Sequence, residues 1–346
     1  RKSYQVNCRL ESLGGELNAF TTKEDTTVHA TVLRNDFTKA VDLLSDVVFH
    51  STFPDKELDK EREVIIDEIN TYKDSPMDMI YDTFEDMLFE GSELGHNILG
   101  TKRDLMRHNS AALHRFVDRT YTTDQMVFAS IGNISDSRIE QIANRYFADY
   151  KPTTRSHTRT APGLYTAFDR EQIKHTHQAH CIIGNRAYSI NEDKRVPFLL
   201  LINILGGPTA NSRLNVSVRE RNGLSYNIEA NYTAYNDCGM AVIYFSSEHC
   251  NSDHCRQIIA DEIKKLQTVR LTTRQLAMAK RQYIAQMTIS TEGNEGYMLG
   301  VGRSMLVHGE VDTLEEAYKK INAVTADQIM EVANEIFTNN STLIYR

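Results

Sequence analysis

The sequence predicts an α+β protein of two domains, and three observations support that prediction. The chain has 346 residues, which is more than one ordinary core needs and enough for two domains of roughly 150 to 200 residues. Segments with the apolar period of helices alternate with Thr- and Val-rich segments typical of strands. The order of several segments in the first half recurs in the second half. We therefore expect domains at 1–155 and 156–346.

These patterns give the elements of the first half. Apolar residues at Phe37, Val41, Leu44 and Val48 keep the spacing of an amphipathic helix. A second helix begins near Asp55, and the Ser-Pro pair at 75–76 interrupts it. The expected elements are one or two strands within 20–33, helices at 37–48, 55–74, 111–120 and 136–146, and a strand at 126–131.

The second half begins after a linker at 151–167, where Pro152, Pro162 and Gly163 occur without an apolar period. A strand at 179–184 opens the second unit. Three pairs of segments agree in type and order, namely 10–15 with 201–207, 58–69 with 276–287, and 121–130 with 337–346. This agreement favours duplicated domains over a short-period solenoid, although two unrelated α+β units can also share such features.

The composition excludes some classes of function. A formal charge of -8 offers no basic stripe for nucleic acid, and no run of about eighteen apolar residues predicts a membrane span. The five cysteines are odd in number and scattered, which favours reduced thiols in the cytoplasm, with the periplasm and the mitochondrial matrix as alternatives. Because the chain begins at Arg1 rather than at a methionine, we expect an upstream segment to have been processed, truncated or omitted.

Glu61 and Glu68 are the first candidate site residues. Seven positions separate them, which is two helical turns, so both carboxylates project from nearly the same face. Apolar neighbours such as Val64 and Ile65 would make a buried carboxylate costly unless a cation neutralised it. The same spacing is also typical of a solvated helix face, because the charged residues at 60, 62 and 63 share the segment.

The run EREVIIDE at 61–68 closely resembles the downstream half of the active-site signature of the pitrilysin/insulinase family of zinc peptidases. In that family an inverted motif, His-x-x-Glu-His, lies roughly 75 residues before a glutamate that completes the metal site. The resemblance implies that Glu68 is the third zinc ligand and faces the metal, while Glu61 is the carboxylate that orients a histidine. The motif is absent from the 346 residues, so we expect a fragment of an active enzyme that is inactive as it stands.

Two further segments are similar to the family pattern and supply candidate substrate-binding residues. The segment at 13–21 resembles the strand beside the zinc site, where an extended peptide adds to a sheet edge, and it carries Asn18 and Ala19. Its glycines are equally explained by the end of a helix. The segment at 205–226 resembles the family's C-terminal motif and contains the candidates Gly206, Gly207, Arg219 and Tyr226.

The resemblance implies that Arg219 and Tyr226 donate hydrogen bonds to the substrate carbonyl near the scissile bond. Without the resemblance, such residues are more often a helix-surface cation and a core aromatic. Two histidine-cysteine clusters, at 175–181 and 249–255, are more simply a strand and a polar turn than metal sites.

The similarity covers essentially the entire chain. It implies two homologous domains, each an antiparallel sheet with helices packed on one face, that form a clam-shell half around a chamber. It also implies hydrolysis of unfolded peptides with zinc, gated by opening and closing, in a homodimer or a heterodimer with a related subunit. One alternative is a non-catalytic structural or substrate-presenting subunit of the same family. Another is a peptide-binding module without chemistry.

Overall fold

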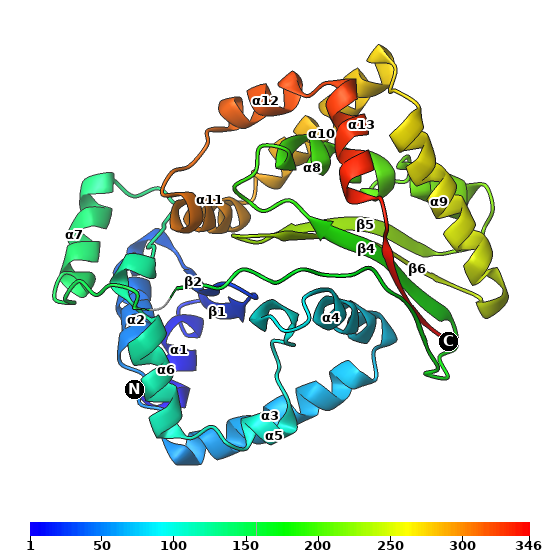
Figure 1. The fold of residues 1–346 in the computed structure, drawn as a ribbon. Coiled ribbons are helices and arrows are strands. Elements are labelled where there is room, and N and C mark those ends of the chain that lie inside the picture. Colours follow the sequence, from blue (N-terminus) through cyan, green and yellow to red (C-terminus); the bar gives the residue numbers. More distant parts are fainter. Residues whose placement is uncertain (157) are drawn as a thin grey trace. The chain divides into compact units, whose positions relative to one another are not determined.

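The computed structural model describes residues 1–156 and 158–346 and divides them into two compact units (Figure 1). Unit 1 comprises 1–69, 98–159 and 289–311, and unit 2 comprises 70–97, 160–288 and 312–346. Each unit takes one helix from the other half of the sequence. Helix α4 (Pro76–Leu88) belongs to unit 2, and helix α11 (Asn294–His308) belongs to unit 1. The predicted domains at 1–155 and 156–346 stay a prediction.

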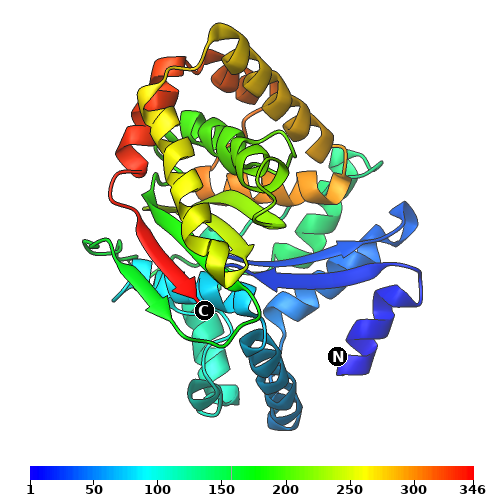
Figure 2. The ribbon, with the colours of Figure 1, turned by 90° about the vertical axis from the view of Figure 1, so that its right-hand side faces the viewer.

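Besides α11, unit 1 contains short helices and one hairpin. They are α1 (Ser3–Glu11), β1 (Glu16–Thr21), β2 (Thr26–Thr31), η1 (Arg34–Asp36), α2 (Phe37–Phe49), α3 (Asp55–Lys73, up to residue 69), α5 (Lys102–Leu105), α6 (Ser110–Thr120), η3 (Thr123–Gln125) and α7 (Asp136–Phe147). The antiparallel strands β1 and β2 are the two dark-blue arrows of Figure 2. Leu10, Ala40 and Leu43 are buried where α1, α2 and this hairpin pack together.

The helices predicted in the first half are confirmed as α2, α3, α6 and α7, and a strand predicted within 20–33 is confirmed as β2. Strand β1 begins at Glu16, before the predicted range, and only its last two residues fall within it. The strand predicted at 126–131 is wrong. These residues form neither helix nor strand, and Phe128 is 39% exposed. The sequence has strand composition, but a strand also needs a neighbour for its backbone hydrogen bonds, and no described strand pairs with this segment.

Unit 2 contains α4 and a five-stranded sheet. Its other elements are η2 (Glu93–Gly95), β3 (Asp169–Gln172), β4 (Ala179–Ala187), α8 (Arg195–Gly206), the π-helix η4 (Asn215–Glu220), β5 (Asn227–Ala234), β6 (Gly239–Ser247), η5 (His249–Asn251), α9 (Ser252–Thr268), α10 (Thr273–Ser290, up to residue 288), α12 (Leu314–Ala323), α13 (Ala326–Ile336) and β7 (Ser341–Tyr345). The strand order is β3-β7-β4-β6-β5, with β3 and β7 parallel and the other pairs antiparallel. The chain is therefore an α+β protein, as predicted.

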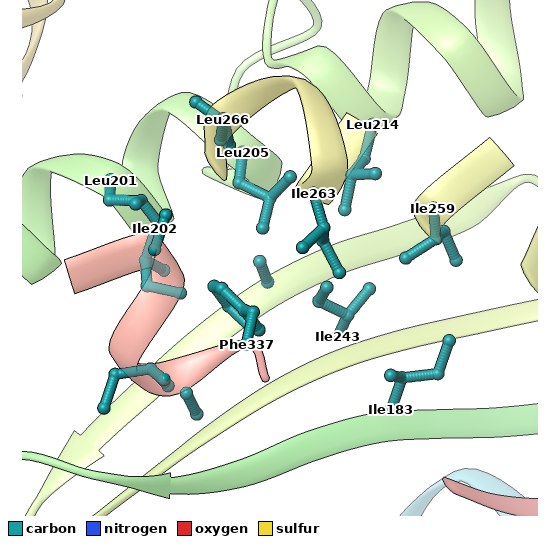
Figure 3. Close-up of a cluster of buried hydrophobic side chains, with 14 of the residues drawn as sticks. Ile183, Leu201, Ile202, Leu205, Leu214, Ile243, Ile259, Ile263, Leu266 and Phe337 are labelled. Atoms are coloured by element: carbon teal, nitrogen blue, oxygen red, sulfur yellow. The ribbon is translucent and has the colours of Figure 1, made fainter. Parts of the chain in front are cut away.

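Helices cover both faces of the unit 2 sheet. Alternate residues of β6, such as Ile243, pack under α8, α9 and α13, and Figure 3 shows Ile243 close to Ile263 of α9 and Phe337. The intervening residues of β6, such as Val242, pack with Phe84 of α4 on the opposite face. Because both faces are buried, β6 is a continuous apolar run rather than an alternating one. The single helical layer implied by the family resemblance is formed by α8, α9 and α13, and α4 adds a second.

In the linker predicted at 151–167, the described residues form neither helix nor strand. Residue 157 of this segment lies outside the described residues. No helix within the described ranges combines the length and the hydropathy needed to cross a bilayer. All five cysteines are described, and none of them forms a disulfide.

Candidate functional site

Helix α3 carries Glu61 and Glu68. Asp55 and Glu57 lie in its first turn and Lys73 in its last, so charges at both ends complement the helix dipole. Both candidate glutamates are exposed. The predicted pair is therefore present on one helical face.

That face is open in the described structure. Val64, which lies between Glu61 and Glu68 on the same side of α3, is 51% exposed, and Ile69 is the buried residue of the helix. Glu68 was expected to face a metal inside the protein, but it is exposed because the described residues leave this side of α3 uncovered.

The described residues contain no group of three or more His, Cys, Asp or Glu side chains that could hold a metal ion. A catalytic zinc ion takes three protein ligands. Glu61 and Glu68 are two carboxylates at most, so they do not make a zinc site by themselves. The donor set described in this chain therefore does not fit zinc by itself.

Strand β1 presents Asn18 and Ala19 at the surface. Both residues are exposed, and the Asn18 Oδ1 atom accepts a hydrogen bond from the Ala19 backbone N–H at 2.9 Å. In the described sheet β1 pairs with β2 alone, so one edge of β1 has no strand beside it. An edge of this kind can add an extended peptide through main-chain hydrogen bonds.

The turn before β1 accounts for both of its glycines. Gly14 has a φ of +73°, and its N–H donates to the Glu11 carbonyl at 2.9 Å, which ends α1. Gly15 lies so close to β2 that a Cβ atom there would approach Val32 Cγ1 to 2.8 Å. These two glycines are required by the backbone path into the hairpin.

Gly206 and Gly207 end helix α8 in unit 2. A Cβ atom on Gly206 would lie 2.6 Å from the backbone nitrogen of Ala230 in β5, so α8 and β5 touch backbone to backbone. Gly207 caps the helix through a hydrogen bond from its N–H to the Asn203 carbonyl at 3.1 Å. The structure thus gives both glycines a packing role, and it leaves their substrate-binding role a prediction.

Arg219 and Tyr226 lie on either side of the turn between η4 and β5. The Arg219 side chain is 49% exposed, and its Nε lies 3.8 Å from Glu220 Oε1. Tyr226 is 86% exposed, so it is not a core aromatic. Gly223, at a φ of +62°, provides the turn between them. Both side chains are therefore accessible to a ligand.

The π-helical turn that carries Arg219 was not predicted. The Arg221 N–H donates to the Val216 carbonyl at 3.0 Å, five residues back, which is the hydrogen bond of a π-helix. Such turns are frequent at functional sites, and one extra residue in a turn leaves no clear trace in the apolar period. Arg213 anchors the segment, with its Nη1 atom 3.9 Å from Glu262 Oε2. Burial lowers the pKa of Arg213, and Glu262 opposes that shift.

Helix α4 fixes strand β5 next to Tyr226. The Tyr81 hydroxyl donates to Glu229 Oε1 at 2.8 Å. Burial, and then the negative charge of Glu229, raise the pKa of Tyr81 above its ordinary value of 10.0. Sequence reasoning missed this pair because 148 positions separate its members.

Two histidines of the clusters at 175–181 and 249–255 have protein partners. His180 Nδ1 lies 2.8 Å from the Tyr244 hydroxyl, and His249 Nε2 lies 2.8 Å from the Thr176 carbonyl. Burial, followed by the charge of His249, lowers the pKa of His180.

The predicted site residues fall into two groups. Glu61, Glu68, Asn18 and Ala19 belong to unit 1. The second group, Gly206, Gly207, Arg219 and Tyr226, belongs to unit 2.

Comparisons with known proteins match this chain in two consecutive parts. Residues 1–102 match the family described as insulinase (peptidase family M16), and residues 108–283 match the family described as peptidase M16 inactive domain. An uncharacterized zinc protease from Bacillus subtilis (strain 168) is 32% identical over 333 residues, which cover 96% of this chain and 81% of that protein. An uncharacterized zinc protease from Rickettsia felis is 28% identical over 342 residues, covering 99% and 82%.

Two solved structures share the fold. The crystal structure of a peptidase M16 inactive domain from Pseudomonas fluorescens superposes with a TM-score of 0.90 at 19% identity, covering 100% of this chain and 83% of that one. The structure of a protease from Helicobacter pylori gives a TM-score of 0.89 at 16% identity, covering 100% and 85%.

Proposed function

We propose that this chain, which belongs to the insulinase family (peptidase family M16), is the peptide-binding and glutamate-bearing part of a zinc metalloendopeptidase. The observation that supports this most directly is the pair Glu61 and Glu68 on one exposed face of α3, within the residues that match the insulinase family. The curated relatives are named zinc proteases, which agrees with the proposal.

The proposal gives the two glutamates different roles. Glu68 would be a ligand of the zinc ion, together with ligands outside the described donor set, and Glu61 would orient one of those ligands by a hydrogen bond. Zinc in such a site supplies an activated water for peptide hydrolysis. The 346 residues contain no His-x-x-Glu-His motif, so we propose that this chain by itself is inactive.

The other candidates would bind the substrate. An unfolded peptide would pair with the open edge of β1 at Asn18 and Ala19, displacing the Asn18 side chain from the Ala19 N–H. Arg219 and Tyr226 would donate hydrogen bonds to a substrate carbonyl as its oxygen gains charge, and their exposure supports this role. We propose that Gly206 and Gly207, at the end of α8, also belong to the substrate-binding group.

Two broader assignments accompany the proposal. We propose a pair of such chains, either a homodimer or a heterodimer with a related subunit. The five cysteines are odd in number and scattered along the sequence, which favours a reducing compartment, and we propose the cytoplasm.

The test uses the full-length gene product and compares Glu68→Gln with Glu63→Gln. Glu63 is also exposed but projects from the opposite side of α3, so it is a matched control. We expect Glu68→Gln to lose stoichiometric zinc, measured by inductively coupled plasma mass spectrometry, and cleavage of an internally quenched peptide. Glu63→Gln should keep both. Stoichiometric zinc in Glu68→Gln would contradict the ligand role.

A second candidate function is a non-catalytic subunit that presents substrate. It is favoured by the match of residues 108–283 to the inactive domain and by the absence of a three-ligand group from the described residues. A full-length product that binds peptide but shows no chelator-sensitive cleavage would support this function over the peptidase. The same result would also support a simple peptide-binding module. Cleavage that a chelator abolishes and zinc restores would exclude both.

A further inference from the structure

Helix α11 contacts the β1–β2 hairpin through two charged side chains. Near its N-terminal end, Glu295 Oε2 accepts a hydrogen bond from Thr31 Oγ1 at 2.8 Å and lies 3.8 Å from His29 Nδ1. About two turns later, Arg303 Nε lies 3.4 Å from Asp25 Oδ2, which precedes β2. Helix α11 therefore holds β2 at both of its ends, although α11 comes from the second half of the sequence.

The residues that Glu295 contacts share a face with Asn18. Thr31 and His29 are two positions apart in β2, so they project to the same side of the hairpin. His29 is directly opposite Asn18 in the strand register, and opposed residues also share a face. Phe20 of β1 places its ring edge-on to His29, with centroids 6.1 Å apart. Glu295 thus contacts the side of the hairpin that carries Asn18.

Burial differs between the residues that α11 contacts and those of β1. The side chains of His29 in β2 and of Asp25 just before it are each 11% exposed, whereas Asn18 and Ala19 of β1 are exposed. Two of the three hairpin residues that α11 contacts, His29 and Asp25, are therefore largely covered, whereas Thr31 and the β1 residues Asn18 and Ala19 remain accessible. An isolated two-stranded hairpin is marginally stable in water, so the geometry of β1 depends on what fixes its partner strand.

We propose that Glu295 is a positioning residue for peptide binding at β1. This inference rests on the proposed function, because it takes β1 to be the strand to which the substrate adds. Glu295 acts through Thr31 and His29 and does not touch the peptide. A strand that is already ordered loses less conformational freedom on binding, so removing the Glu295 carboxylate weakens peptide binding.

A different role for Glu295 would be to stabilise α11 alone, since an acidic side chain in the first turn of a helix complements its dipole. The variant Thr31→Val separates the two roles. It removes the hydrogen bond from the strand side and leaves the charge in α11 unchanged.

The experiment measures two quantities on the 346-residue chain. One is the affinity for a fluorescein-labelled unstructured peptide, by anisotropy, and the other is amide hydrogen exchange in residues 16–21. We expect Glu295→Ala to weaken binding about five-fold and to speed exchange in β1. Thr31→Val should change both in the same direction, and the double variant should be no worse than Glu295→Ala, because both remove one interaction. Glu292→Ala, a nearby exposed carboxylate, is the control and should change neither.

Each contrary result has a distinct meaning. Wild-type affinity in Glu295→Ala, or effects of Glu295→Ala and Thr31→Val that add independently, would overturn the positioning role. A wild-type chain that binds no peptide would overturn the proposed role of β1 and the positioning role with it. Unchanged exchange in Glu295→Ala, beside normal peptide binding by the wild type, would overturn the positioning role alone.

Discussion

Gly206 at the end of α8 lies against Ala230 of β5 with no room for a side chain between them. A Cβ atom on Gly206 would approach the Ala230 backbone nitrogen to 2.6 Å and its Cβ to 2.7 Å. The contact closes the core of unit 2 at the place where the chain turns toward the π-helix. Gly206 is therefore explained by packing, whatever its part in binding substrate.

Gly206→Ala should lower the free energy of unfolding by about 1–3 kcal/mol, because a backbone atom, not a flexible side chain, has to move. Urea unfolding followed by circular dichroism measures this. Gly300→Ala in α11 is the control, since nothing lies within 4 Å of its added Cβ. That variant should be neutral or stabilising by up to about 1 kcal/mol. Equal stability of Gly206→Ala and wild type would contradict the close packing.

Arg219→Ala should reduce turnover of the full-length peptidase by about 100-fold or more, as expected for a lost donor to a developing oxyanion. Its zinc content and its free energy of unfolding should stay near those of the wild type, because half of the side chain is exposed. Arg221→Ala, two residues further on and also exposed, is the matched control. Similar kcat values for the two variants would argue against a role for Arg219 in the reaction.

His180 should make the stability of unit 2 fall in acid. Its pKa in the folded protein is below the ordinary value of 6.5, so the unfolded chain binds its proton first. The contribution of His180 is therefore fully present above pH 6.5 and is lost as the pH falls from there toward the folded pKa. Urea unfolding at pH 7.5 and at pH 5.5, values chosen to bracket about 6.5, should show a smaller difference for His180→Gln than for wild type. The exposed His308→Gln is the control, and an unchanged difference in His180→Gln would refute the lowered pKa.

Arg186→Lys should destabilise unit 2 although it keeps the charge. The Arg186 guanidinium lies over the rings of Phe89 and Tyr165, each 5.3 Å from its centroid, and donates to the Leu88 carbonyl at 2.9 Å. A lysine cannot reproduce the planar stacking together with the hydrogen bonds, so we expect a loss of about 1–2 kcal/mol. Thermal unfolding compared with Arg170→Lys, on the exposed strand β3, checks this. A loss no larger than that of Arg170→Lys would mean that the stacking contributes nothing.

Local elements could be predicted from the sequence because their signals are local. The apolar spacing from Phe37 onward gave α2, and the Ser-Pro pair at 75–76 marked the end of α3. The segments 121–130 and 337–346 show the limit. They have similar composition, yet only the second contains a strand, β7, because β3 and β4 lie beside it.

The sequence could predict which residues belong to the candidate site, but it could not predict what surrounds them in the folded protein. The spacing of Glu61 and Glu68 fixed their common face, while their exposure depends on what covers α3. The π-helical turn at Arg219 and the contact of Glu295 with Thr31 have no periodic signal. The latter joins positions 264 apart in the chain.

The place of α4 in unit 2 has a consequence for how the protein is made. Residues 76–88 are synthesised well before strands β4 and β6, whose face they cover. Until those strands emerge from the ribosome, the apolar side chains of Ile80, Phe84 and Leu88 remain exposed to solvent. A gene fragment that starts at residue 156 would produce the opposite defect, a sheet with Ile182, Val242 and Leu343 uncovered. Neither half is therefore a sound unit for separate expression, and nascent chains of this protein should recruit holdase chaperones until synthesis has passed β6.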